Sequence, residues 1–317
     1  MAVLLTLICP VYRVREFIPD LLDSLLRGVN SPEVRLIFIN DGTPDESMDL
    51  LRARLAASEG QRRFEFDCID QPVNRGLSAS RNLGLDLADS PYIGMIDSDD
   101  IVDSQYFSVL RPYLLDGRND LVEFGYAEFT DAAAWPGAGT GRELPSSQLN
   151  PYLHDFFSWT RVYKAELLRG LRYPVDAVYE DVRFVAEVFG RVRCSVRLSH
   201  ALVGYRKRAD SITEVRKRDR RYAEQMIHLV DGTALALAGH AWPGQVLALT
   251  ARRACIILLK GARIVDVQER RAFFQACRPP LGRLQALCRA QQGSWRAAPW
   301  LALARAGLLA QRPFGLA

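Results

Sequence analysis

Three aspartates that follow a short apolar segment are the side chains of this sequence best suited to chemistry. Asp97, Asp99 and Asp100 come directly after the apolar segment Tyr92–Ile96. Ligands of open α/β sheets bind at the carboxyl ends of strands, and carboxylates gathered there repel one another unless a cation neutralises them. Carboxylate oxygens suit Mg²⁺ or Mn²⁺, which take one or two of them and complete their coordination with phosphate oxygens. The spacing indicates a metal–diphosphate site, with an acidic, solvated turn as the alternative.

Two earlier apolar segments end in similar polar groups, at Cys9–Arg13 and at Asn40–Thr43. If these segments are parallel strands, their carboxyl ends meet at one edge of the sheet. Tyr12 then offers an aromatic ring and Asp41 a hydrogen-bond acceptor, which suits a base that carries an N–H group, such as uracil. Taken singly, each cluster is also consistent with an ordinary turn.

The segment Gln71–Gly84 adds groups that can bind an anion. Gly76 and Ser78 lie where a helix is expected to begin, so free backbone N–H groups there can face a phosphate. Arg75 and Arg81 can add charge-assisted hydrogen bonds. A capped helix with solvated arginines is the alternative for this segment alone.

The elements that must position these groups alternate between strand and helix patterns. Continuous apolar runs predict strands, and apolar residues at helical spacing predict helices between them. The predicted strands are 4–9, 34–39, 64–69 and 92–96, and the predicted helices are 17–26, 45–55 and 76–87. This alternation predicts an α/β fold with parallel β-α-β units. Beyond residue 100 we expect a helix over 105–115, a strand over 121–129, a loop over 132–150, a helix over 182–189 and only helices after 215, with breaks at Pro243-Gly244, Pro279-Pro280 and Pro299.

Composition narrows the class of protein. The 317 residues are 49% hydrophobic and 25% charged, as is usual for a globular protein, and a net charge of +4 is too small to argue for nucleic-acid binding. The six cysteines include no Cys-x-x-Cys pair, which argues against a zinc ribbon and favours a reducing, cytosolic compartment. We expect the apolar N-terminus to be the first core strand rather than a signal peptide. No apolar run approaches the ~20 residues of a spanning helix, so we expect a soluble or peripheral protein.

Four motifs occur in order along the chain: Ile8–Tyr12, Ile39–Asp45, Asn74–Asn82 and Ile96–Asp100. Together they closely resemble glycosyltransferase family 2, the inverting, nucleotide-sugar-dependent enzymes of the GT-A fold. The resemblance covers residues 4–215. It implies a Rossmann-like mixed sheet flanked by helices, in a catalytic domain over 1–215 with a nucleotide-sugar half to residue 100 and an acceptor half from 101. A helical C-terminal region over 216–317 follows.

For the nucleoside, the resemblance implies a pocket lined by Pro10, Tyr12 and Asp41, with Asp41 reading the base. Asn40 stands where many family members carry the first Asp of a pair, and others also carry Asn there. The family often uses UDP and Asp41 suits uracil, so a UDP-sugar is the expected donor.

For the diphosphate, the resemblance implies that the turn at Gly76 and Ser78 lies beside it together with Arg81. Asp97 would approach the ribose. Asp99 would hold the divalent cation, Mn²⁺ or Mg²⁺.

Downstream, Ser158–Leu168 resembles the acceptor-side segment of the bacterial surface-polysaccharide members, with Trp159 as the expected acceptor contact. Many relatives carry Lys where this chain has Arg161. The family's Glu-Asp motif maps onto Glu180 and Asp181. Inversion by direct displacement needs one general base for the acceptor hydroxyl, and we expect Asp181 to be that base, supported by Glu180. As the alternative, both carboxylates merely favour the positive N-terminus of a helix.

The segment Tyr205–Thr213 resembles the family's closing segment, whose basic residues would neutralise the leaving group. A solvated basic loop is the alternative. Some related enzymes use a histidine near here as a metal ligand, but His200 is out of register, and we expect it to be structural.

The C-terminal tail is basic. From Arg270 to the end it carries eight arginines and no acidic residue, with Trp295, Trp300 and Phe314 among its apolar residues. Contact with an anionic membrane surface, packing on the catalytic domain and a homodimer contact are all consistent with this composition.

These observations predict an inverting, metal-dependent hexosyl- or N-acetylhexosaminyl-transferase. It would use a nucleotide-sugar donor and a glycan or lipid-linked acceptor in surface polysaccharide synthesis, in the cytoplasm or peripherally on the inner face of the membrane. A metal-dependent nucleotidylyltransferase is one alternative, although Cys9–Glu16 contains no glycine of the kind it would carry. A non-catalytic nucleotide-sugar or glycan-binding module is the other, and the presence of both Asp99 and Asp181 argues against it.

Overall fold

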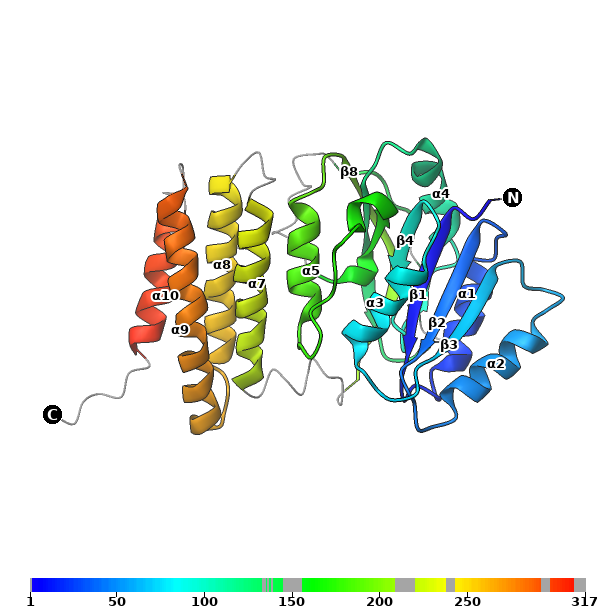
Figure 1. Ribbon diagram of the computed structural model, residues 1–317, viewed down its shortest axis with the longest axis horizontal. Helices are drawn as coiled ribbons and strands as arrows, with labels where there is room; N and C mark the ends of the chain where they lie inside the picture. Colours follow the sequence, from blue (N-terminus) through cyan, green and yellow to red (C-terminus); the bar gives the residue numbers. More distant parts are fainter. Residues whose placement is uncertain are drawn as a thin grey trace. The chain divides into compact units, whose positions relative to one another are not determined.

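The computed structural model describes residues 2–132, 135, 137, 139–144, 156–208, 220–237, 243–291 and 297–310. The chain forms two compact units (Figure 1). The first consists of Met1–Leu149, Phe157–Asp176 and Val192–Lys207, and the second of Asn150–Phe156, Ala177–Arg191 and Arg208–Ala317. The prediction placed a single boundary at residue 215. In the structure the second unit also includes Ala177–Arg191, which come before that boundary in the sequence. The segment with Glu180 and Asp181 therefore belongs to the helical unit.

The first unit is built on one eight-stranded mixed sheet with the order β3-β2-β1-β4-β7-β6-β8-β5. The strands are β1 (Leu5–Val11), β2 (Val34–Asn40), β3 (Glu65–Asp70), β4 (Tyr92–Met95), β5 (Ile101–Val102), β6 (Leu121–Phe129), β7 (Arg161–Lys164) and β8 (Ser195–Arg206). Strands β1 to β4 run parallel, and β7 pairs antiparallel with both β4 and β6. Every residue of β1 is buried, as expected for a parallel strand covered on both faces. The predicted α/β class with a mixed sheet is confirmed.

Helices fill the connections between the parallel strands (Figure 1). They are α1 (Ile18–Gly28), α2 (Ser47–Ala57) and α3 (Leu77–Leu87), and α4 (Tyr106–Asp116) follows the short strand β5. Helix α3 packs directly on β1, because a Cβ at Gly84 would lie only 2.3 Å from Cγ2 of Ile8. Glycine at this position fixes the distance of α3 from the sheet, and with it the position of Arg81 on the same helix.

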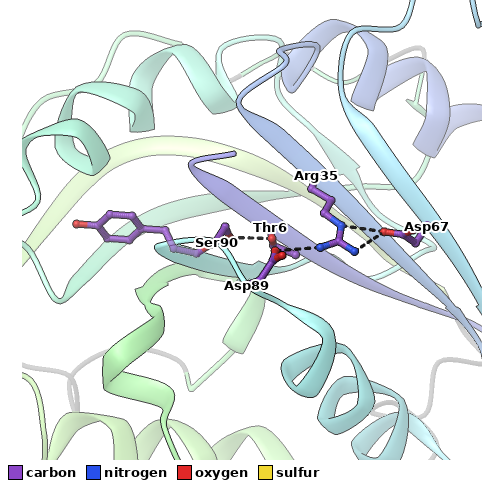
Figure 2. Close-up of polar contacts among 6 residues, drawn as sticks. Thr6, Arg35, Asp67, Asp89 and Ser90 are labelled. Carbon is purple, nitrogen blue, oxygen red and sulfur yellow. Dashed lines mark hydrogen bonds and ion pairs between the residues drawn. The ribbon is translucent and has the colours of Figure 1, made fainter. Parts of the chain in front are cut away.

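Polar contacts secure the entry of β4 into the sheet (Figure 2). Arg35 of β2 donates to Asp67 of β3 at 2.8 Å and to Asp89 at 2.9 Å. Ser90 donates to the Thr6 hydroxyl of β1 at 2.7 Å. Asp89 and Ser90 come just before β4, so these bonds hold the start of that strand next to β1. The carboxyl ends of β1, β2 and β4 take no part in these contacts.

The second unit is helical, which confirms the expected C-terminal region. It contains α5 (Glu180–Phe189), the 3₁₀ turn η6 (Arg220–Ala223), α7 (Glu224–Ala236), α8 (Pro243–Gly261), α9 (Val267–Ala290) and α10 (Ala298–Ala310). The prediction that Pro279-Pro280 breaks the chain is wrong, since α9 runs through both prolines. Its buried residues recur at helical spacing on both sides of them: Phe273, Cys277, Leu281, Leu284 and Cys288. Burying this stripe outweighs the ~3 kcal/mol or more that a proline inside a helix costs.

Within the described residues, none of the helices combines the length and apolarity needed to cross a membrane. Trp295 and Phe314 of the basic tail lie outside the described residues, as does much of the expected loop over 132–150.

Candidate active site

The carboxyl ends of β1, β2 and β4 lie side by side at one edge of the sheet, because β1 pairs in parallel with both neighbours. The residues that follow these strands are Tyr12, Asp41 and the turn Asp97–Asp100. Burial raises the pKa of the Cys9 thiol in β1 well above its ordinary value, and the charges of the three aspartates in the turn raise it further. The carboxylates therefore lie close to the end of β1, as expected for parallel strands.

Asp97 is held by Arg81 of α3. Nη2 of Arg81 is 2.8 Å from Oδ1 of Asp97, and the guanidinium lies over the ring of Tyr173, 5.3 Å from its centroid. Asn82 of the same helix binds both backbone groups of Tyr173, at 2.8 and 2.9 Å. The side chain of Arg81 is 1% exposed, whereas that of Asp97 is 24% exposed. A rigid, buried cation thus orients a carboxylate that still reaches solvent.

Arg206, the last residue of β8, secures the other half of the turn. Its backbone N–H donates to Oδ1 of Asp100 at 2.7 Å, and its Nε donates to the Asp99 carbonyl at 2.7 Å. Its Nη2 donates to Asp20 of α1 at 2.8 Å. In the sequence Arg206 belongs to the expected closing segment, of which residues 209–213 lie outside the described residues. The contacts of Arg206 hold the backbone of the acidic turn, and the expected neutralisation of the leaving group by this segment stays a prediction.

Asp41 holds the loop that leads into α3. Its carboxylate oxygens accept four hydrogen bonds of 2.8 to 3.1 Å, two from the backbone N–H groups of Arg75 and Gly76 and two from the side chains of Gln71 and Asn74. Gly76 has a φ of 85°, a conformation that glycine adopts without steric cost. Asp41 therefore shapes the turn at Gly76 and Ser78, and its expected contact with the base stays a prediction.

Replacing Asp41 with asparagine should weaken UDP binding about tenfold or more and lower the midpoint of thermal unfolding. The amide nitrogen of asparagine cannot accept a hydrogen bond, so buried donors lose their partner at a cost of about 1–3 kcal/mol. Calorimetric titration with UDP measures the effect, with Asp49→Asn, at an exposed position of α2, as the control. Unchanged affinity for UDP would show that the loop needs no help from Asp41.

Tyr12 follows β1 with 37% of its surface exposed. Arg13 has a φ of 53° and its guanidinium lies over the Tyr12 ring, 5.3 Å from the centroid. The Arg13 N–H donates to the Thr43 hydroxyl at 2.8 Å, which ties the end of β1 to the turn after β2. Pro10 is buried within β1, opposite Ile39. The result is a partly exposed aromatic ring beside the turn that contains Asp41.

In the second unit, Glu180 and Asp181 form the first turn of α5. Tyr179, which precedes them, has a left-handed backbone with a φ of 62°, and its carbonyl accepts the Val182 N–H at 3.1 Å. Both carboxylates are half-buried. Because a helix N-terminus stabilises negative charge, this position favours the anionic carboxylate that a general base requires.

The donor-side residues fall within a match to one protein family. The model of the family described as Glycosyl transferase family 2 matches residues 6–170. The chain belongs to glycosyltransferase family 2. The matched part includes all four motifs at the strand ends and stops before α5.

Relatives of this family 2 chain include the uncharacterized glycosyltransferase EpsJ of Bacillus subtilis, 31% identical over 67% of this chain and 63% of EpsJ. Glycosyltransferase GlyA of Streptococcus pneumoniae is 26% identical over 72% of this chain and 33% of GlyA. The chain thus spans less than two thirds of the length of either curated relative.

Among solved structures, Staphylococcus aureus TarS 1–349 in complex with UDP-GlcNAc matches with a TM-score of 0.72 and 15% identity. The match covers 98% of this chain and 89% of the TarS chain. The mixed sheet with a helical C-terminal region is the arrangement of GT-A structures such as TarS, so the GT-A fold expected from the motifs is confirmed.

The family 2 resemblance implies a divalent cation at the acidic turn. Within the described residues, no group of three or more His, Cys, Asp or Glu side chains is arranged to hold a metal ion by itself. Oδ2 of Asp100 is buried without a hydrogen-bond partner in the described part of the chain. Burial raises the pKa of Asp100 well above its ordinary value, and the charges of Asp99 and Asp97 raise it further. This crowding fits a cation held by the half-buried Asp99 and completed by phosphate oxygens.

Trp159 of the family 2 chain is 3% exposed and lies within an aromatic cluster. Its ring stacks on Phe157 with centroids 4.8 Å apart and on Tyr205 with centroids 5.4 Å apart, and it meets Tyr126 edge-on at 5.0 Å. The three neighbours are only half-buried. Trp159 supports the rings that reach solvent, and its own expected contact with an acceptor stays a prediction.

Arg161 forms a buried ion pair that sequence analysis missed. Its Nη2 is 2.8 Å and its Nε 2.9 Å from Oε2 of Glu123, and the two side chains are 1% and 4% exposed. Nη1 donates to the Phe157 carbonyl and to the Thr160 hydroxyl. The planar fork of arginine makes all these bonds at once, which the ammonium of lysine cannot do. The arginine where many relatives carry lysine therefore anchors the backbone around Trp159.

Asn40 also departs from many relatives, and the structure supplies a reason. Its amide donates to Oδ1 of Asp70 at 2.8 Å and its carbonyl accepts the Thr43 N–H at 2.9 Å. An aspartate at position 40 would keep the second bond but would face the Asp70 carboxylate with a like charge. Asparagine thus joins the ends of β2 and β3.

A cavity of about 370 Å³ lies between α1 and α2, lined by Leu22, Leu26, Leu55 and Phe64 among others. An ion pair of 3.5 Å between Arg54 and Asp23 stands at its wall. The cavity shares no residue with the acidic turn or the Asp41 loop, and we assign it no role in the chemistry.

Proposed function

We propose that the chain is an inverting glycosyltransferase that moves a sugar from a UDP-sugar to a glycan or lipid-linked acceptor in surface polysaccharide synthesis. The observation that carries the proposal is the convergence of Tyr12, the Asp41 loop and the Arg81-bound Asp97–Asp100 turn at the ends of three parallel strands. An aromatic ring, a helix N-terminus and a carboxylate turn are the groups that a nucleoside diphosphate requires. The family and the UDP-GlcNAc complex of TarS support a nucleotide-sugar donor.

In the proposed reaction the acceptor hydroxyl oxygen attacks the anomeric carbon of the sugar. A new glycosidic C–O bond forms while the bond from that carbon to the β-phosphate oxygen breaks, and UDP leaves with the electron pair. Asp181 takes the proton of the acceptor hydroxyl, and Glu180 supports it from the same helical turn. Attack opposite the leaving group inverts the anomeric centre, so an α-linked donor gives a β-linked product.

On the donor side, Asp99 would hold Mn²⁺ or Mg²⁺, which when bound offsets the charge that grows on the departing diphosphate. Gly76 and Ser78 would present backbone N–H groups to the phosphates, and Arg81 would keep Asp97 aimed at the ribose. Tyr12 would stack on the base. We base these roles on the geometry of the strand ends, where hydrogen bonds fix the backbone that carries these side chains.

We place the enzyme in the cytoplasm, where nucleotide sugars are made, and at the inner face of the membrane when its acceptor is lipid-linked. The excess of arginine after residue 270 supports contact with an anionic surface. A homodimer through the same helices is the competing use of that surface. Sedimentation with vesicles of phosphatidylglycerol separates the two, because a dimer contact needs no lipid.

Thermal unfolding with UDP tests the donor site. A ligand at ~100 times its dissociation constant adds about 2.7 kcal/mol, which should raise the midpoint by several degrees in a protein of this size. We expect the shift with UDP and Mn²⁺, a smaller one with UDP and EDTA, and none with GDP. A shift with GDP alone would overturn the assignment of the base but keep the enzyme class, and no shift with either nucleotide would contradict the donor site.

A further inference from the structure

The turn that presents the proposed base is held by α7, a helix that comes later in the sequence. The Val178 N–H donates to Oε2 of Glu224 at 3.0 Å. Glu224 is the first residue of α7 and lies 46 residues further along the chain. The bond ties the backbone two residues before Glu180 to α7, within the second unit.

A second side chain of α7, that of His228, lies near the backbone of Val178. Burial lowers the pKa of His228 below its ordinary value and Arg183 adds to this, whereas Glu224, Asp231 and a hydrogen bond with the Val178 backbone oppose it. Glu224 and His228 are four residues apart, hence on one face of the helix.

The backbone that follows needs such support. Tyr179 holds a φ of 62°, which is costly for a residue with a large side chain. Helix α5 has no side-chain cap at its N-terminus. The Tyr179 ring meets Tyr222 edge-on, with centroids 5.8 Å apart. Contacts from α7 and the turn before it therefore replace a local cap.

Helices α5 and α7 are also in close contact, which fixes the position of Glu224 relative to the turn before α5. A Cβ at Gly232 of α7 would lie 2.7 Å from Cβ of Ala186, and one at Gly190 would lie 2.6 Å from Cα of Ala236. Helix α7 is joined in turn to α9, where Arg283 is 2.9 Å from Asp231. The contacts of α7 thus connect the turn before α5 to the C-terminal helices.

We propose that Glu224 is a positioning residue for acceptor activation, and that the C-terminal helices serve to hold the Asp181 turn in its reactive conformation. This inference rests on the proposed function, because it takes Asp181 as the base. In this proposal Glu224 acts through the Val178 backbone, which sets the direction in which Glu180 and Asp181 leave the turn.

The test uses the full chain and pairs each disruptive variant with a conservative one. Glu224→Leu removes the acceptor for Val178, whereas Glu224→Gln keeps an amide oxygen there. Gln225→Leu is the matched control, since it makes the same kind of change at the next residue of α7, for which the described part of the chain shows no bond to Val178. The readout is release of UDP from UDP-GlcNAc or the best of a UDP-sugar panel, with water as the acceptor, alongside UDP binding.

We expect Glu224→Leu to lower kcat by about 10- to 100-fold, the scale of a displacement of about 1 Å at a reacting group, with the donor KM and UDP affinity unchanged. Glu224→Gln and Gln225→Leu should stay within about threefold of the parent. A threefold change is less than half of the 1.4 kcal/mol that corresponds to a tenfold change. Equal losses in Glu224→Leu and Glu224→Gln, or an unaltered kcat in Glu224→Leu, would overturn the proposal. If Glu224→Leu does not fold, Glu224→Ala against Glu224→Gln makes the same comparison. Asp181→Asn separates the two hypotheses. Full activity in Asp181→Asn would contradict the assignment of the base itself. An inactive Asp181→Asn beside a fully active Glu224→Leu would contradict only the positioning role of Glu224.

Discussion

Asp181→Asn should abolish transfer while leaving UDP binding intact. The asparagine side chain is nearly isosteric with aspartate but cannot take a proton, and a positioned general base contributes about 10²–10⁴-fold to the rate. The donor groups at the ends of β1, β2 and β4 belong to the other unit. The thermal shift produced by UDP and Mn²⁺ should therefore be the same in Asp181→Asn as in the parent protein.

Release of UDP from the preferred UDP-sugar measures the rate, and Glu180→Gln is the neighbouring control. That variant should lose less activity, because Glu180 supports the base without accepting the acceptor proton. Transfer that survives in Asp181→Asn would make the base assignment wrong. A parent protein that binds UDP but releases none from any UDP-sugar would instead favour a non-catalytic binding module.

Arg161→Met should lower the free energy of unfolding by about 3–5 kcal/mol, because it leaves the Glu123 carboxylate buried without its cation. Both side chains are almost fully enclosed, at 1% and 4% exposure. Solvent therefore cannot compensate for the lost partner. Urea unfolding followed by circular dichroism measures the change.

The double variant Arg161→Met with Glu123→Leu should regain most of the loss, since removing both charges leaves an apolar pair in place of the buried ion pair. Arg118→Met is the surface control, because the Arg118 partner of Asp116 is 80% exposed and such pairs contribute about 0–1 kcal/mol. The free energy of unfolding of Arg161→Lys should lie between those of the parent protein and Arg161→Met, because lysine keeps the charge but lacks the planar guanidinium. A double variant as unstable as Arg161→Met would show that the loss comes from packing and not from the orphaned carboxylate.

The parallel half of the sheet was predictable from sequence because its strands are continuous apolar runs. Every residue of β1 is buried, and β2 is buried at five of its seven positions, so no alternation obscures the pattern. Strand β8 was not predicted, because polar residues such as Arg197, Ser199 and His200 interrupt it and much of it is only half-buried. Its pairing with β6 is visible only in the folded chain.

The strand-end motifs could likewise be assigned, whereas the residues that orient them could not. Arg206 binds Asp100 across 106 positions of sequence, and Arg161 binds Glu123 across 38. Nothing in the local spacing of an arginine identifies a partner so far away. The same holds for Glu224, which an isolated helix pattern presents as an ordinary acidic residue in a first turn.

The path of the chain between its two units limits how the protein can be divided for expression. A fragment that stops at residue 207 contains every strand of the sheet, yet it also carries α5 without α7, the helix that meets Ala186 and Gly190. Such a fragment would keep Asp181 but lose the Glu224 side chain that accepts the Val178 N–H. A shortened protein with a complete sheet should therefore bind nucleotide and fail as a catalyst, although every residue named in the reaction is still present.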